Sequence, residues 1–107
     1  MGRQLRPEER YAFDEDGFIL NPGDWDEDLA VELALNDGLD ELTDQHWKVI
    51  GYLREHYLAH QTLPPQSYVE WLFAMPRDEV RRIFHSMREA WRIAGLPNPG
   101  EEAKAYM

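Results

Sequence analysis

Two histidines at helical spacing are the first residues whose types and positions could do chemistry. His56 and His60 lie four residues apart, so in a helix they share one face and their imidazoles could chelate a metal ion. A catalytic zinc site needs a third ligand, and no His-Glu-x-x-His pattern accompanies the pair. Two exposed or hydrogen-bonded histidines at a helix end are the simpler interpretation, so we predict no metal site and no cofactor.

The acidic residues form two short clusters, at residues 14–16 and 24–28. General acid–base catalysis needs carboxylates in partly desolvated positions that separate their pKa values, whereas clusters on loops and first helical turns are usually solvated. Ser67 and Ser86 are the only serines, and neither lies in a nucleophile-elbow sequence. The sequence has no glycine-rich phosphate loop either. We therefore predict no catalytic residue and a protein that is not an enzyme.

Five arginines near the C-terminus are the strongest candidate for a binding surface. We predict a helix over residues 77–94, along which four arginines recur on one face. They are Arg77, Arg81, Arg88 and Arg92, with Arg82 beside them. Such a basic docking strip could bind an acidic protein partner or a phosphate backbone. Local pairs with Asp78 and Glu89 on a solvated helix face are the alternative explanation.

The composition limits the possible functions further. The chain of 107 residues contains no cysteine, which excludes a disulfide, a thiolate metal site, a cysteine nucleophile and a persulfide carried on the chain itself. Its net charge of −10 is uneven, because residues 1–45 hold fourteen acids and three arginines, whereas residues 46–107 hold seven acids and eight bases. A uniformly acidic protein would repel nucleic acid, but the nearly neutral second part permits a local basic surface.

Neither a membrane span nor a signal peptide is evident in the sequence. No apolar run approaches the roughly 20 residues that a membrane-spanning helix needs. Residues 1–7 lack the apolar segment of a signal peptide. We therefore expect a cytoplasmic protein.

We expect one mainly helical (α+β) domain over residues 1–107, with a loosely held polar segment at 1–9. The pair Asp16-Gly17 between two short apolar runs predicts a small β-hairpin. Asp24, followed three residues later by Glu27, predicts the cap of a first helix that Gly38 closes. Further helices are predicted at residues 44–60, capped by Thr43, at 65–74 and at 77–94. A small hairpin or meander would thus pack on an array of four or five helices.

The apolar residues of these helices predict the core. In the helix at 44–60 they form a stripe of Trp47, Ile50, Leu53, Tyr57 and Leu58. The helix at 65–74 is apolar nearly all round, so it is either deeply buried or partly a contact surface. In the helix at 77–94 the inward residues are Val80, Ile83, Phe84, Met87 and Trp91.

The three helices of residues 44–94 and the two breaks between them are also typical of a helix-turn-helix protein. A recognition helix for nucleic acid needs exposed polar and basic residues. The helix at 65–74 offers Gln66, Ser67, Tyr68 and Glu70, and no base. A nucleic-acid-binding regulator is therefore the alternative function.

The stretch after the last helix predicts an extended C-terminal arm over residues 95–107. Gly95 can end the helix because it tolerates a left-handed backbone. Pro97 and Pro99 then prevent the helix from resuming and hold Leu96 and Asn98 extended. We expect this arm to be short, stiff and protruding.

The residues Ile93-Ala94-Gly95-Leu96-Pro97, with Pro99, resemble the arm of the DsrC/TusE family of sulfur-relay proteins, which ends in Ile-Ala-Gly-Leu-Pro-Lys-Pro and then a cysteine. Further motifs occur in the family's order: Asp16-Gly17-Phe18-Ile19-Leu20, then Trp25 with Leu29-Ala30, then Leu42-Thr43-Asp44-Gln45-His46-Trp47 with Leu53-Arg54 and Tyr57. The family's Leu-Phe-Pro-x-Gly-Pro loop before the last helix is replaced by residues 83–87.

The resemblance implies a small β-meander packed on helices, and an arm whose near-terminal cysteine carries sulfur to a partner. That cysteine's position falls at about Glu102, and a second cysteine of the sulfite-reductase-linked members matches Trp91. A carboxylate and an indole can form neither a persulfide nor a disulfide. We therefore expect a binding or regulatory component that contacts a sulfur-relay or sulfite-reductase-type partner through Gly95, Leu96, Pro97, Pro99 and Glu102. A relay component that uses another chain's cysteine is a further possibility.

Overall fold

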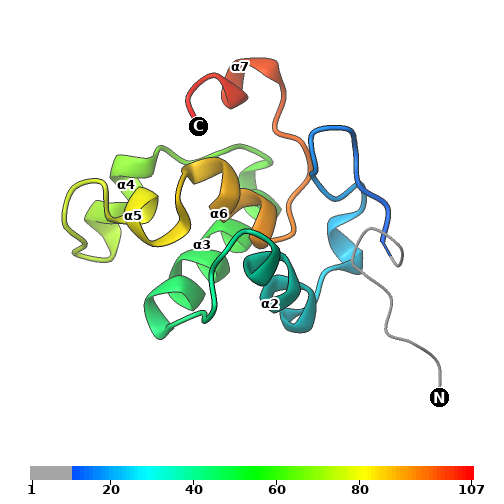
Figure 1. Ribbon diagram of the computed structural model, residues 1–107. Coiled ribbons are helices and arrows are strands. Elements are labelled where there is room, and N and C mark those ends of the chain that lie inside the picture. Colours follow the sequence, from blue (N-terminus) through cyan, green and yellow to red (C-terminus); the bar gives the residue numbers. More distant parts are fainter. Residues whose placement is uncertain (1–10) are drawn as a thin grey trace.

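The central element of the fold is α6 (Met87–Ile93), which packs against three other helices. Its neighbours are α2 (Glu27–Asn36), α3 (Asp44–His60) and α5 (Glu79–Phe84), and α5 also packs on α4 (Gln66–Leu72) (Figure 1). A 3-10 helix, η1 (Pro22–Asp24), precedes α2, and the short helix α7 (Glu101–Lys104) follows α6. This computed structural model describes residues 11–107, so the expected segment 1–9 lies outside the described part.

The long helix α3 has the predicted bounds because its first turn is capped from both sides. The Thr43 hydroxyl accepts the His46 backbone N–H, and the His46 Nδ1 accepts the Thr43 backbone N–H at 2.9 Å. Since Nδ1 is an acceptor, Nε2 carries the proton and donates to the carbonyl of Ile83 at 2.8 Å. His46 is buried, and its hydrogen bonds fix the start of α3 against the segment that carries α5.

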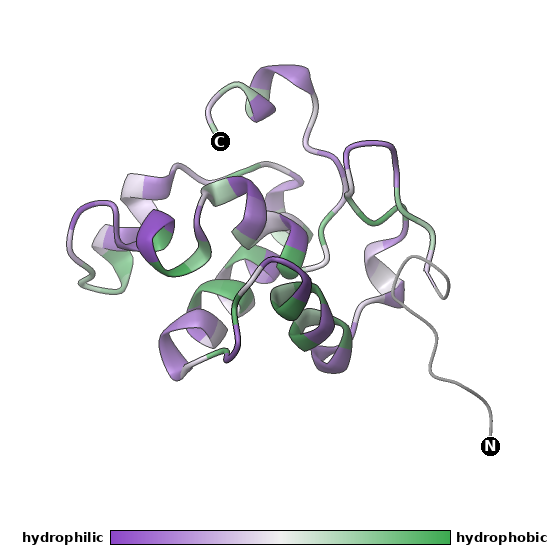
Figure 2. Cartoon of the chain, viewed as in Figure 1, coloured by the Kyte–Doolittle hydropathy of each residue, from purple (hydrophilic) through white to green (hydrophobic). Residues whose placement is uncertain are grey.

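The core lies where α2, α3, α5 and α6 meet, and hydrophobic residues are concentrated on the facing sides of α2 and α3 in Figure 2. Ile50 and Leu53 are fully buried, as predicted, whereas Trp47 and Tyr57 are half-buried. Leu58 is 72% exposed, so its assignment to the apolar stripe is wrong; it lies on the outer side of α3. None of the helices within residues 11–107 is long and apolar enough to cross a membrane.

The predicted β-hairpin and meander are wrong, although the chain does reverse at Asp16-Gly17. Within residues 11–107 the β pairing is limited to one antiparallel bridge between Phe13 and Ile19. The Asp14 carboxylate accepts the backbone N–H groups of Asp16 and Phe18, each at 2.9 Å, and so takes the Phe18 donor that a regular ladder would pair with the Asp14 carbonyl. Two backbone bonds still cross the turn, from Asp14 to Phe18 at 2.8 Å and from Leu20 to Ala12 at 2.9 Å. The result is a tight turn, here called the N-terminal turn (residues 12–20), in a mainly helical fold.

The cap of α2 also differs from the prediction. Asp24 ends η1, and the side chain of Asp26 accepts the Leu29 backbone N–H at 2.8 Å. The cap shifts because Asn21 and Pro22 start η1 first, so Asp24 is the last residue of η1 and does not cap α2. Trp25 thereby lies between two helical segments, where its indole can turn inward.

The single helix predicted over residues 77–94 is wrong, because the chain breaks between α5 and α6. His85 has a φ of 77°, a left-handed conformation that no α-helix continues through. Ser86 then caps α6 by accepting the Glu89 backbone N–H at 3.1 Å. The five arginines therefore do not line one face of one helix.

Helix α4 is buried on one side only, so the prediction of a deeply buried helix is wrong and a partial contact surface stays a prediction. Val69 is fully buried against the core, whereas the Trp71 side chain is 73% exposed. Tyr68 and Leu72 are exposed as well. One side of α4 therefore belongs to the core and the other presents apolar side chains to solvent.

Two glycine-to-alanine substitutions should change stability in opposite directions. Gly95 has a φ of +71°, and an added Cβ would lie 1.9 Å from Cδ1 of Trp25. We expect Gly95→Ala to lower the free energy of unfolding by about 2–4 kcal/mol, the sum of backbone strain and overpacking. Urea denaturation at constant pH measures this loss.

Gly51→Ala is the matched control, because Gly51 lies inside α3 and an added Cβ would have no atom within 4 Å. We expect this substitution to raise the free energy of unfolding by about 1 kcal/mol, the difference in helix propensity. A Gly95→Ala protein as stable as the parent would contradict the packing described for Gly95.

Candidate functional site: the C-terminal arm

The arm (residues 95–107) starts from a tightly packed junction. Gly95 ends α6 with its backbone N–H bonded to the Arg92 carbonyl at 3.0 Å, and Trp25 packs directly against its Cα. The Trp25 indole N–H donates to the Ile93 carbonyl at 2.9 Å. The predicted helix end at Gly95 is therefore confirmed, and the reason for glycine is close approach as well as backbone conformation.

Arg54 completes this junction from α3. Its guanidinium lies 4.1 Å from the centroid of the Trp25 ring and donates to the carbonyls of Ala94 at 2.8 Å and Gly95 at 3.2 Å. A third bond reaches the Pro22 carbonyl at 3.2 Å. Burial lowers the pKa of Arg54 from its ordinary value. The bonds satisfy carbonyls that the end of α6 would leave unpaired.

The first residues of the arm belong to the core and do not protrude. Leu96 is 1% exposed, and the indole N–H of the buried Trp91 donates to the Pro97 carbonyl at 2.7 Å. Trp91 thus fastens the arm through a hydrogen bond. The expectation of a freely protruding arm is wrong for residues 95–97.

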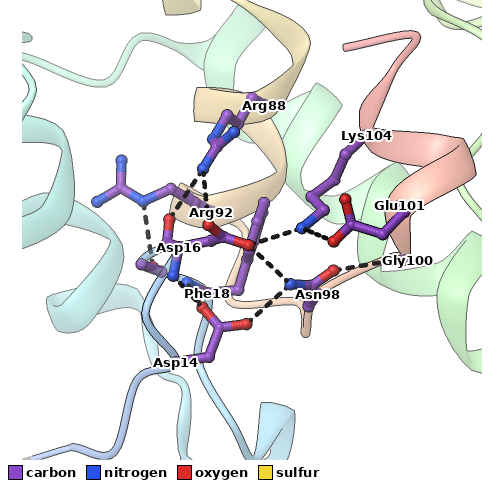
Figure 3. A network of polar contacts seen from close by, with 10 residues as sticks. Asp14, Asp16, Phe18, Arg88, Arg92, Asn98, Gly100, Glu101 and Lys104 are labelled. Carbon is purple, nitrogen blue, oxygen red and sulfur yellow. Dashed lines mark hydrogen bonds and ion pairs between the residues drawn. The ribbon is translucent and has the colours of Figure 1, made fainter.

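Farther along, polar contacts hold the arm against the N-terminal turn (Figure 3). The Asn98 side-chain amide donates to Asp14 at 3.0 Å and to Asp16 at 3.3 Å. Lys104 forms ion pairs with Asp16 at 2.6 Å and with Glu101 at 2.7 Å. The hydrogen bond from Lys104 is the largest cause that lowers the pKa of Asp16, and the same bond raises the pKa of Lys104.

A groove of about 680 Å³ separates the arm from the segment that joins α3 to α4. Its lining comprises Gln61, Thr62, Leu63, Pro64, Pro65, Gln66, Ser67 and Met87 on one side and Pro99, Glu102, Ala103 and Tyr106 on the other. Glu102 on this lining is exposed. The groove therefore gives this position a partly apolar surrounding that solvent can reach.

The structure separates the arginines of the predicted strip into different environments. Arg88 and Arg92 on α6 point to the N-terminal turn: Arg88 donates to the Asp16 carbonyl at 3.1 Å and Arg92 to the Gly17 carbonyl at 3.2 Å. Arg82 pairs with Glu79 on α5. Arg77 and Arg81 are exposed. Two of the five are thus engaged in holding the fold.

Arg92 also joins two carboxylates that lie close together. Its Nη1 contacts Asp37 at 2.9 Å, at the end of α2, and Glu89 of α6. Burial first, and then the hydrogen bond that the protonated Glu89 carboxyl group donates to Asp37, raise the pKa of Glu89 to about 7. Near neutral pH a substantial fraction of Glu89 is therefore protonated, although a guanidinium lies beside it.

The two histidines of the pair lie side by side near the end of α3. The His56 and His60 ring centroids lie 4.8 Å apart, and His56 Nε2 is 3.1 Å from the Thr62 hydroxyl. Burial and the neighbouring His60 lower the pKa of His56. Residues 11–107 contain no group of three or more potential metal ligands.

These features define a small helical protein whose C-terminal arm is fastened at its base and carries no thiol. The family described as "DsrC like protein" matches residues 7–101, so the chain belongs to the DsrC-like family. The resemblance inferred from the sequence motifs is thereby confirmed, and residues 102–107 lie beyond the match.

Relatives with known names support the same assignment. Sulfurtransferase TusE of Salmonella choleraesuis is 34% identical over 95 residues, which cover 80% of this chain and 86% of that protein. The oxidized γ-subunit of the dissimilatory sulfite reductase (DsrC) from Archaeoglobus fulgidus is 31% identical, with a TM-score of 0.74 over 85% of this chain and 90% of that one. DsrC from Pyrobaculum aerophilum is 35% identical, with a TM-score of 0.74 over 85% of each chain.

Glu89, beside Arg92, should make the free energy of unfolding fall as the pH rises. Glu89 has a folded pKa of about 7 against an ordinary value of 4.5, so its contribution is fully present below pH 4.5 and is lost as the pH rises through 7. The side chain in Glu89→Gln stays uncharged. We therefore expect the free energy of unfolding of this variant to rise relative to that of the parent as the pH increases from 5 to 8.

Urea denaturation of the two proteins across this range measures the gain. The difference between the two proteins is the relevant quantity, because the carboxylates with lowered pKa values, such as Asp14 and Asp16, cancel in it. A difference that does not change with pH would contradict the raised pKa of Glu89.

Proposed function

We propose that this chain is a non-catalytic binding or regulatory component of sulfur transfer that acts through its arm. The observation that carries the proposal is the family's fold without any cysteine in the chain. Sulfur carriage as a persulfide and thiol exchange both need a thiolate. Glu102 and Trp91 stand where the resemblance places the family's cysteines, and neither side chain can supply one.

The partner we infer is a sulfur-relay or sulfite-reductase-type protein. Among the relatives, one is named a sulfurtransferase and another a subunit of dissimilatory sulfite reductase. Glu102 is exposed beside an apolar groove, which supports contact between this part of the arm and another protein. A partner that normally meets a thiol at this position would meet a carboxylate here.

Nothing in the structure or the comparisons favours nucleic-acid binding. Arg88 and Arg92 bond to the N-terminal turn, and α4 carries no base. Phosphate contacts need available Lys and Arg side chains, which the acidic chain offers sparingly.

A pull-down from native lysate tests the proposal. The baits are the full chain and a chain that ends after Asn98, which keeps Leu96 and Pro97 in the core. We expect the full chain to recover sulfur-transfer or sulfite-reductase subunits, and the shortened chain to recover at least tenfold less.

Lys48→Met in the full chain is a control for unspecific charge effects, because Lys48 is exposed on α3, away from the arm. Equal recovery by the full and shortened baits, or recovery of no sulfur-transfer protein by either, would overturn the proposal.

A further inference from the structure

A second groove lies between α3 and α4, and three aromatic side chains line it. It has a volume of about 440 Å³ and shares no lining residue with the groove beside the arm. Trp47 and Tyr52 of α3 contribute to it, together with Phe73 at the end of α4. The Tyr52 and Phe73 rings pack edge to face, with centroids 6.0 Å apart, and Leu72 beside them is 40% exposed. Aromatic surface of this kind is enriched where proteins bind one another.

The middle of this groove is open because Gly51 has no side chain. Gly51 is exposed inside α3, and an added Cβ would have no atom within 4 Å. Glycine is unfavourable in the interior of a helix, and no contact within residues 11–107 uses the space above it. A glycine on an exposed helix face does permit another backbone to approach closely.

Two opposite charges flank Gly51 on the same face of α3. Lys48 precedes it by three residues and Glu55 follows it by four, and both are exposed on the lining of the groove. The two residues are about 10 Å apart along the helix axis, since each residue adds about 1.5 Å. Within residues 11–107 neither forms an ion pair, so both charges are available to another molecule.

The order of these residues is complementary to itself. In a symmetric pair of antiparallel α3 helices that cross between Gly51 and Tyr52, each copy presents the same surface to the other. Lys48 and Glu55 are each three residues from this crossing point, so Lys48 of one copy lies opposite Glu55 of the other. Two ion pairs form in this way, whereas parallel helices would set Lys48 against Lys48.

We propose that the groove between α3 and α4 is the interface of a symmetric dimer, in which a second copy of this chain covers Gly51 and pairs its Glu55 with Lys48. The aromatic lining and Leu72 supply the apolar centre of this interface, and the two ion pairs fix its antiparallel direction. The dimer goes beyond the proposed function and does not depend on it, because the groove beside the arm lies outside the interface.

Two measurements described above bear on the same residues. Lys48→Met, the control in the pull-down, removes one of the paired charges and should still recover the same proteins, since the arm is not part of the interface. Denaturation of Gly51→Ala belongs at concentrations at which the chain is monomeric, because a methyl group at the crossing point also weakens the dimer.

Analytical ultracentrifugation of the full chain over a range of concentrations tests the dimer. We expect the parent to show a reversible equilibrium between monomer and dimer. Lys48→Glu and Glu55→Lys each replace two ion pairs by two contacts between like charges, and we expect each to raise the dissociation constant roughly tenfold or more. The double variant Lys48→Glu/Glu55→Lys restores both pairs and should return the constant to within about threefold of the parent.

The two single variants also separate specific pairing from a general effect of charge. The net charge of −10 becomes −10 − 2 = −12 in Lys48→Glu and −10 + 2 = −8 in Glu55→Lys. General repulsion would therefore shift their dissociation constants in opposite directions, whereas the interface predicts that both rise. An equal mixture of the two single variants should dimerise like the parent, since one copy then presents two carboxylates and the other two ammonium groups.

Glu15→Lys is the matched control, because it makes the same charge change as Glu55→Lys at an exposed position. It lies in the N-terminal turn, on the opposite side of the molecule from α4 (Figure 1), and should not weaken the dimer. A parent that stays monomeric up to about 1 mM would overturn the proposal. A double variant that associates no better than the single variants would overturn it too, as would a control that dissociates like Glu55→Lys.

Discussion

The packing of Trp25 against Gly95 is the contact on which the rest of the structure depends. A glycine is required there because the indole occupies the space of a side chain, at 1.9 Å from an added Cβ. The Arg54 guanidinium lies 4.1 Å from the centroid of the Trp25 ring and bonds to the carbonyls at the end of α6. One contact thus joins α3, α6 and the segment before α2, and it fixes the direction in which the arm leaves the core.

Beyond this junction, both apolar and polar contacts attach the arm to the body. Leu96 and the Trp91–Pro97 hydrogen bond fasten its base inside the core. Asn98 and Lys104 hold its end to Asp14 and Asp16 at the surface. A chain that has no cysteine to fasten or load its arm can still keep the arm in a defined place, which is what a binding role requires.

Local signals made much of the fold predictable. Thr43 and the apolar residues that follow it at helical spacing predict both ends of α3 correctly, and Gly95 predicts the end of α6. The break between α5 and α6 was also encoded, since Ser86 followed by Glu89 is a capping signature. It was hidden because apolar residues continue at helical spacing across His85.

The polar attachments could not be predicted, because their partners lie far apart in sequence. Asp16 and Lys104 are separated by 88 residues, and Arg54 and Ala94 by 40, so no periodic pattern links them. The prediction of a β-hairpin at Asp16-Gly17 is wrong for a related reason. The Asp14 side chain accepts backbone N–H groups, among them one that would otherwise pair with the facing strand. Charge alone suggests a basic strip, whereas in the structure Arg88 and Arg92 bond to the carbonyls of Asp16 and Gly17.

Hydrogen exchange of the indole N–H groups, measured by nuclear magnetic resonance, tests most directly whether Trp25 is fixed against Gly95. The indole N–H groups of Trp25 and Trp91 donate to the carbonyls of Ile93 and Pro97, whereas the Trp71 side chain is 73% exposed and serves as an internal reference. We expect the indole N–H groups of Trp25 and Trp91 to exchange at least a hundredfold more slowly than that of Trp71. Exchange of Trp25 at the rate of Trp71 would contradict a fixed junction at Gly95.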